Sequence, residues 1–181
     1  MRNFLKKNYP ITLAIWPYMF FLLSYAIGKH ENLYMPFVVI YIILTIAVYL
    51  SNIIYACLYK GEDSCYRLAF WNMLTKLIHI PFYLVTFFGA FIVLCAIVVP
   101  ALTFVAPFAA AWILFINVCL MVTSSVYGVN ALVRAGAKRV VSIKYAVINA
   151  ILHFFFVADV ISSIILFINV RKAKKQMEAK E

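Results

Sequence analysis

The sequence consists mainly of long apolar runs that are separated by short polar interruptions. A hydrocarbon core about 30 Å thick requires roughly twenty predominantly apolar residues in a helix, which satisfies its own backbone hydrogen bonds. By this criterion the pattern predicts an all-α fold, a polytopic transmembrane helical bundle with about five spans. The expected spans cover residues 10–27, 35–58, 79–99, 108–129 and 143–169.

The third and fourth expected spans share one long apolar region. Residues 68–132 contain only two ionisable groups that can carry positive charge, Lys76 and His79. The region is too long for one transmembrane helix, and Pro100 and Pro107 interrupt its helical pattern. Two spans joined by a short apolar connection are the simplest division.

A short interfacial amphipathic helix is expected before the third span, over residues 66–78. Its polar positions include Asn72, Thr75 and Lys76, and His79 continues the same i, i+3, i+4, i+7 spacing. These residues therefore share one helical face. An amphipathic helix of this kind lies in the headgroup plane of a membrane.

The composition agrees with a membrane protein. Hydrophobic residues make up 67% of the chain and charged residues only 12%, against about a quarter in an ordinary soluble domain. No stretch of mixed composition is long enough for a separate soluble domain. We expect residues 1–181 to form a single integral membrane domain of the cell membrane that ends in a basic tail over 170–181.

The formal net charge of +10 comes from Lys and Arg residues that flank the apolar runs. This placement predicts contact with the lipid bilayer and with anionic lipid headgroups near the basic loops, not with nucleic acid.

With the N-terminus inside, five spans put ten basic residues inside and six outside, including the tail. The positive-inside rule disfavours an external basic tail. A sixth span within 68–132 would bring the tail inside but would export the basic residues of 134–144.

Polar residues within the apolar runs are the candidate functional residues, because they are costly in lipid. In a five-span bundle most of them converge on one leaflet. They predict a polar vestibule that faces the cytoplasm, with Asp159 at its floor and Lys76 as counter-charge. The candidates for a substrate or ion pathway are Asn52, Lys76, His79, Ser124, Asn149, His153 and Asp159.

Motifs of known chemistry are lacking. The sequence contains no GxSxG, HExxH or GxxxxGK[ST] motif, so an enzyme is not favoured, although intramembrane catalysis stays open. No closely spaced pair of ligands indicates a metal site, and no cofactor is expected. The four cysteines form no CxxC pair and are expected to be small core residues.

Two functional hypotheses follow. The first is a small transporter, channel or ligand-binding membrane subunit that uses the vestibule. The second is a noncatalytic accessory, assembly or immunity-type protein that binds another membrane protein or a second copy of itself. In the second hypothesis Asp159 hydrogen-bonds to Ser163 and to a neighbouring helix and only holds the bundle together.

Overall fold

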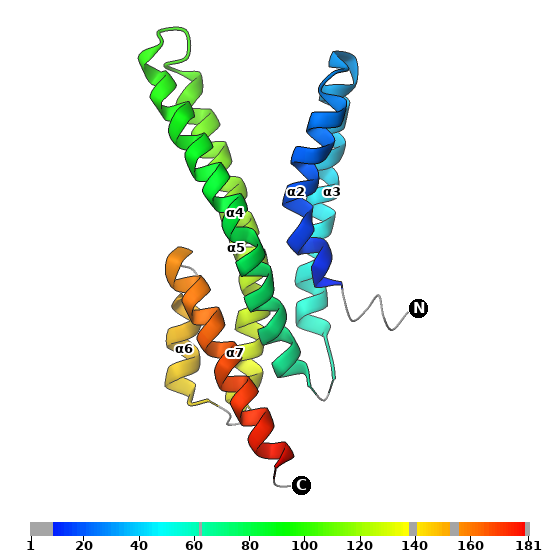
Figure 1. Cartoon of the computed structure of the whole chain (residues 1–181), viewed down its shortest axis with the longest axis vertical. Coiled ribbons are helices and arrows are strands. Elements are labelled where there is room, and N and C mark those ends of the chain that lie inside the picture. Colours follow the sequence, from blue (N-terminus) through cyan, green and yellow to red (C-terminus); the bar gives the residue numbers. More distant parts are fainter. Residues whose placement is uncertain (1–8, 62, 138–140, 153–155, 180–181) are drawn as a thin grey trace.

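The computed structural model describes residues 9–61, 63–137, 141–152 and 156–179, which are helical with short connections and contain no strand. This confirms the all-α fold. The helices are α2 (Pro10–Ile27), α3 (Glu31–Leu58), α4 (Ser64–Cys95), the short 3-10 helix η1 (Ala96–Val98), α5 (Val105–Ala137), α6 (Ile143–Leu152) and α7 (Phe156–Glu178) (Figure 1).

Four helices are long and apolar enough to cross a membrane, which supports a membrane-embedded protein. These candidate spans are Pro10–Ile27, Asn32–Leu58, Ser64–Val98 and Val105–Ala137. A separate interfacial helix over 66–78 is not observed, because these residues form the first part of α4, which continues through Pro81. The polar face of this segment is covered by neighbouring helices, so it faces the interior of the bundle.

The expected fifth span over 143–169 is not confirmed. Its residues are divided between α6 and α7, which lie side by side and antiparallel, so the chain turns back (Figure 1). Two hydrogen bonds join the pair, from Ser162 Oγ to Asn149 Oδ1 at 2.9 Å and from Asn169 Nδ2 to Tyr145 Oη at 3.0 Å. In one straight helix the two partners of each bond would be far apart, whereas the hairpin brings them within hydrogen-bonding distance.

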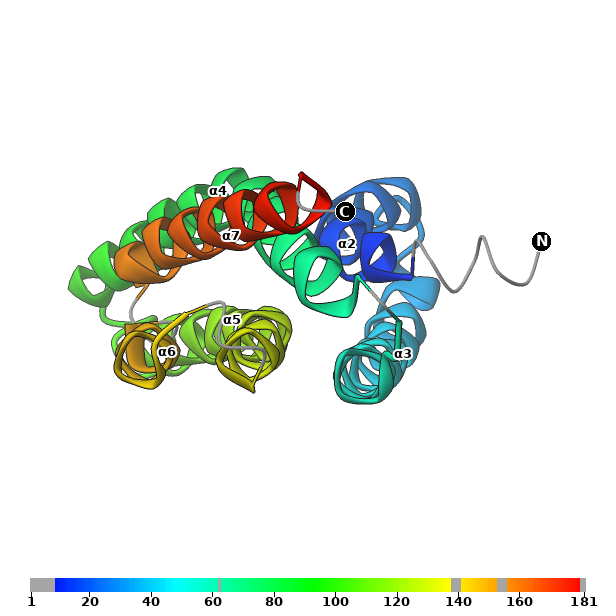
Figure 2. The same cartoon turned by 90° about the horizontal axis from the view of Figure 1, so that it is seen from below.

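The described helices α2 to α7 therefore form three hairpins, α2/α3, α4/α5 and α6/α7. α4 occupies the centre and contacts α2, α5 and α7, while α3 contacts α2 and α5. Viewed along the long axis, the α2/α3 pair lies on one side of the bundle and α4 and α5 lie on the other, with α7 next to α4 and α6 next to α5 (Figure 2). The α6/α7 hairpin covers only the lower part of α4 and α5 in Figure 1.

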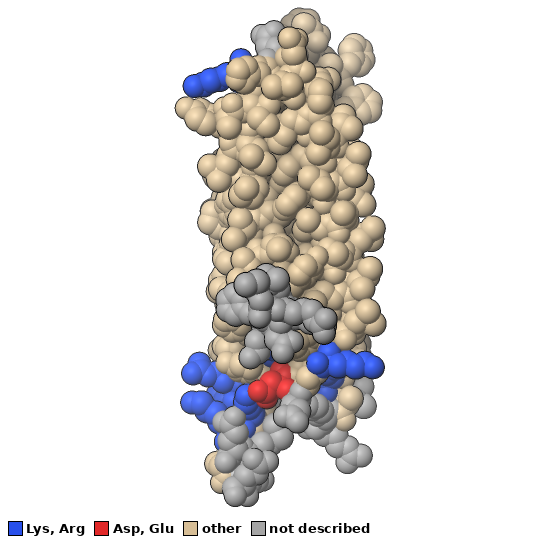
Figure 3. All heavy atoms as spheres, turned by 90° about the vertical axis from the view of Figure 1, so that its right-hand side faces the viewer, with Lys and Arg blue, Asp and Glu red and all other residues tan. Residues whose placement is uncertain are grey.

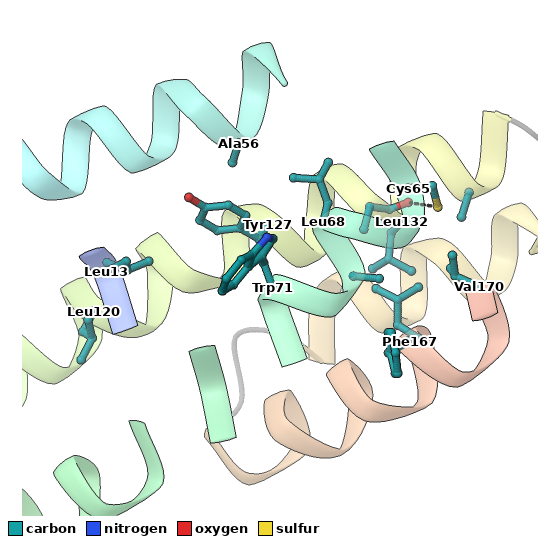
Figure 4. Close-up of a cluster of buried hydrophobic side chains, with 14 of the residues drawn as sticks. Leu13, Ala56, Cys65, Leu68, Trp71, Leu120, Tyr127, Leu132, Phe167 and Val170 are labelled. Carbon is teal, nitrogen blue, oxygen red and sulfur yellow. Dashed lines mark hydrogen bonds between the residues drawn. The ribbon is translucent and has the colours of Figure 1, made fainter. Parts of the chain in front are cut away.

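The buried apolar core lies where all three hairpins meet. Its almost completely buried side chains include Leu13 of α2, Leu68 of α4, Tyr127 and Leu132 of α5 and Leu166 of α7. All of these except Leu166 are labelled in Figure 4. All four cysteines are free thiols, and only Cys65 is buried. Large apolar side chains elsewhere on the helices are exposed, as expected for surfaces that face lipid.

Candidate functional site

A buried ion pair lies at the junction of α4 and α7. Lys76, in α4, donates a hydrogen bond from Nζ to the carboxylate of Asp159, in the first turn of α7. Lys76 is 1% exposed and Asp159 is 3% exposed. Because an unpaired charge in an apolar interior costs several kcal/mol, each of these groups depends on the other.

Ser125 connects the pair to a third helix. Lys76 Nζ also donates to Ser125 Oγ, on α5, at 3.2 Å, and Ser125 is itself buried. Among the described residues, the ammonium group therefore has a charged partner on α7 and a neutral partner on α5. The site joins the central α4/α5 hairpin to the shorter α6/α7 hairpin.

The start of α7 favours a carboxylate at this position. Asp159 lies in the first turn of the helix, where the partial positive charge of the helix dipole stabilises an anion by about 0.3–1 kcal/mol. In Figure 1 the start of α7 lies beside α4 and α5, between the two ends of these helices. The hairpin is thus what brings Asp159 to Lys76.

The face of α4 around Lys76 has hydrogen-bonding capacity that the described residues do not use. Asn72, Thr75 and His79 are completely buried. The carboxamide nitrogen and oxygen of Asn72, Thr75 Oγ1 and His79 Nδ1 have no hydrogen-bond partner among the described residues. Leaving such a group unsatisfied costs about 1–3 kcal/mol. The face expected to meet headgroups is instead an interior polar surface.

His79 contacts α2, not the ion pair. Its Nε2 lies 3.1 Å from the backbone carbonyl oxygen of Leu13. A carbonyl only accepts hydrogen bonds, so Nε2 carries the proton in the neutral ring and Nδ1 is left as an acceptor.

A second polar network lies between α2, α3 and α5. The Tyr127 hydroxyl donates to Asn52 Oδ1 at 2.7 Å. Asn52 Nδ2 donates to the Val48 carbonyl at 2.9 Å and to Thr12 Oγ1 at 3.3 Å. Among the described residues, no hydrogen bond links this network to the Lys76–Asp159 pair. Asn52 therefore serves a different junction from the one that we expected.

The other expected site residues lie apart from the ion pair. Asn149 bonds to Ser162 within the hairpin. Ser124 donates to the Met121 carbonyl of its own helix at 2.9 Å. Ser163 donates to Val160, also within its own helix, at 2.7 Å. His153 lies outside the described residues.

Of the expected residues, the structure thus brings only Lys76 and Asp159 into direct contact in its described part. Ser125 was not singled out in the sequence, because its neighbour Ser124 is chemically identical and only helix packing distinguishes them. No group of three or more His, Cys, Asp and Glu residues suited to a metal ion occurs within the described ranges.

The sequence matches a family of unknown function (DUF6652) over residues 8–173. The chain belongs to this family. The match extends from the residues just before α2 into the last turns of α7, and it includes both members of the ion pair. No curated protein and no solved structure matches the chain. A functional inference therefore rests on the geometry of the site.

Proposed function

We propose that the protein is a small membrane transport protein. In this proposal the Lys76–Asp159 ion pair breaks when a proton or a proton-linked solute passes. The observation that carries this proposal is the burial of both charges between α4, which is long enough to span the membrane, and the first turn of α7. Ionisable residues within membrane segments typically mark ion pathways and proton relays.

The energetics of the pair favour a functional role over a purely structural one. Burying two charges costs several kcal/mol each, and apolar residues of similar volume often stabilise a protein equally well or better. A chain that needed only an anchor for α7 could use apolar contacts. A buried ion pair is better suited to a role in which the two charged groups change their partners during transport.

The shorter α6/α7 hairpin supports the same proposal. Helices that end inside a membrane are tolerated where they are enclosed by protein or border a polar interior, and transporters use such broken helices around their binding sites. Here the start of α7 carries Asp159 towards α4. On α4, Asn72 and Thr75 lie on the same side as Lys76 and offer unused donors and acceptors to a polar solute.

Charge placement suggests which end faces the cytoplasm. Among the described Lys and Arg residues, Lys29 lies in the connection between α2 and α3, at one end of the bundle (Figure 1). Lys60, between α3 and α4, and Arg134 and Lys175, in the last turns of α5 and α7, lie towards the other end. Most of the blue surface in Figure 3 gathers at this second end. Four spans return the tail to the same side as the connection between α3 and α4. The conflict with the positive-inside rule then disappears, and we infer that this basic end is cytoplasmic in a cell membrane.

The second candidate function is that of a noncatalytic accessory, assembly or immunity-type protein that binds another membrane protein. The exposed apolar surface of α3 favours it: Val39, Ile43 and Ile46 are each more than half exposed. A partner helix could cover this surface in place of lipid. In this case the ion pair only fixes the hairpin.

A flux assay on vesicles separates these candidates. The purified protein is reconstituted with a pH-sensitive dye inside, a pH gradient is imposed, and its decay is compared with that in protein-free vesicles. The variant is the double replacement Lys76→Met with Asp159→Leu, which removes both charges together and should keep the fold. The control is Lys29→Gln at the other end of the bundle.

We expect the wild-type protein and the Lys29→Gln control to dissipate the gradient severalfold faster than protein-free vesicles. The double variant should fall to the protein-free rate while unfolding at about the wild-type temperature. Wild-type flux in the double variant, or no flux with the wild type, would contradict a proton pathway through the pair and favour the accessory role.

A further inference from the structure

A polar groove lies between α6 and α7 near the basic end of the bundle. Its volume is about 330 Å³, and its polar lining consists of Ser142, Tyr145, Asn169, Lys172 and Gln176. Pockets that hold small ligands range over about 300–1,000 Å³. The groove is therefore large enough for a small polar group, and it is separate from the Lys76–Asp159 pair.

The groove offers hydrogen-bond donors and one positive charge. Ser142 Oγ accepts from the Tyr145 backbone N–H at 3.2 Å, and Tyr145 Oη accepts from Asn169 Nδ2 at 3.0 Å. Within the described residues neither hydroxyl donates, so both O–H groups are available. Burial raises the pKa of Tyr145, which keeps its phenol protonated. Lys172 adds an exposed ammonium group.

The surroundings of the groove also favour an anion. Among the described residues, no carboxylate belongs to its lining. Lys144, Arg171 and Lys175 are exposed basic residues on the same two helices. The nearby acidic residue Asp63 is already paired, because Lys174 Nζ lies 2.7 Å from its Oδ2. A negatively charged ligand would therefore be attracted by these basic residues, and no described carboxylate of the lining would compete with it.

We propose that this groove binds the phosphate group of an anionic phospholipid. Lys172 would supply the charge, and the Ser142 and Tyr145 hydroxyls would donate to the phosphate oxygens; charge-assisted hydrogen bonds of this kind are stronger than neutral ones. A phospholipid is favoured over free phosphate because the groove lies at the end of the bundle, where the headgroups of one leaflet gather. Basic pockets between membrane helices bind anionic headgroups in this way.

The proposal does not depend on the transport function and is tested by binding alone. The detergent-solubilised full chain is titrated with short-chain phosphatidylglycerol, phosphatidylcholine or inorganic phosphate, and its thermal unfolding is followed. The variants are Lys172→Gln and Tyr145→Phe, both of which keep the shape of the side chain. The control is Lys175→Gln, which removes an exposed charge of α7 outside the groove.

We expect phosphatidylglycerol, but neither phosphatidylcholine nor inorganic phosphate, to raise the unfolding temperature. Lys172→Gln should raise the apparent Kd about fivefold, the effect of one basic residue near an anionic surface. Tyr145→Phe should weaken binding less, and Lys175→Gln least. Equal losses in Lys172→Gln and Lys175→Gln would indicate diffuse surface attraction and overturn the site. Equal stabilisation by inorganic phosphate would overturn the lipid assignment.

Discussion

The two halves of the bundle along its long axis differ in both composition and architecture. The half that carries the basic end contains all three hairpins and encloses Lys76 and Asp159. In the far half the described chain forms only the α2/α3 and α4/α5 hairpins, and side chains such as Phe87 and Phe91 are largely exposed. The difference indicates that the third hairpin is present where charges have to be enclosed, because an apolar surface needs no cover in lipid.

The largest effect is expected from removing one charge of the pair. Asp159→Leu leaves the Lys76 ammonium buried without its carboxylate, which should cost about 3–5 kcal/mol. Denaturant-induced unfolding in detergent measures this loss. A loss of unfolding free energy as small as that expected on replacing an exposed side chain would mean that the pair is not enclosed. The two halves would then not differ as described.

The double replacement Lys76→Met with Asp159→Leu sharpens this result. It should recover most of the stability that Asp159→Leu loses, because no uncompensated charge remains. A double-mutant cycle gives the coupling energy between the two residues. Additive losses would contradict a direct pair.

A smaller effect is expected at the junction of α3 and α5. Tyr127→Phe removes the donor to Asn52 Oδ1 and leaves that oxygen unsatisfied in a buried position, at a cost of about 1–3 kcal/mol. Tyr25→Phe serves as a matched control, because Tyr25 is 80% exposed. Equal effects of the two changes would exclude a stabilising role for the Asn52 network.

Ser162→Ala tests the hairpin itself with a still smaller effect. It removes the hydrogen bond to Asn149, and hydrogen bonds between membrane helices contribute about 0.6 kcal/mol on average. Ile161→Leu, at the exposed neighbouring position, should change the unfolding free energy less. If Ser162→Ala has no effect beyond this control, α6 and α7 are not held together at this point.

The smallest effect is expected in the far half. Phe88 is exposed on α4, so Phe88→Leu should change the unfolding free energy by no more than about 0.5 kcal/mol. The same assay measures it. A loss similar to that of Tyr127→Phe would show that this surface is packed against protein, and the contrast between the halves would then be false.

Much of the fold could be predicted because long apolar runs determine membrane helices. The first expected span, 10–27, has the same limits as α2, and the second ends with α3 at Leu58. The division of 143–169 could not be predicted, since this run contains neither Gly nor Pro and is long enough to span a membrane. Its turn depends on contacts between α6 and α7 that a count of apolar residues does not reveal.

The candidate site was only partly predictable for a similar reason. Helical periodicity placed Asn72, Thr75 and Lys76 on one face, but it does not specify whether headgroups or other helices cover that face. The cost of charge in lipid pointed to Asp159 and Lys76, and the structure brings them together. Their role in a pathway stays a prediction. The contribution of Ser125 depends on how α5 is rotated against α4, which the sequence does not specify.

The central claim is that residues 143–169 turn back within the membrane and place the tail on the same side as the connection between α3 and α4. Sided labelling of single cysteines tests it most directly, with cysteines at Lys29, Lys60 and Lys175 on a cysteine-free background. A membrane-impermeant thiol reagent should reach the Lys60 and Lys175 positions from one side and the Lys29 position from the other. Labelling of the Lys175 position from the same side as Lys29 would contradict the hairpin and restore a fifth span.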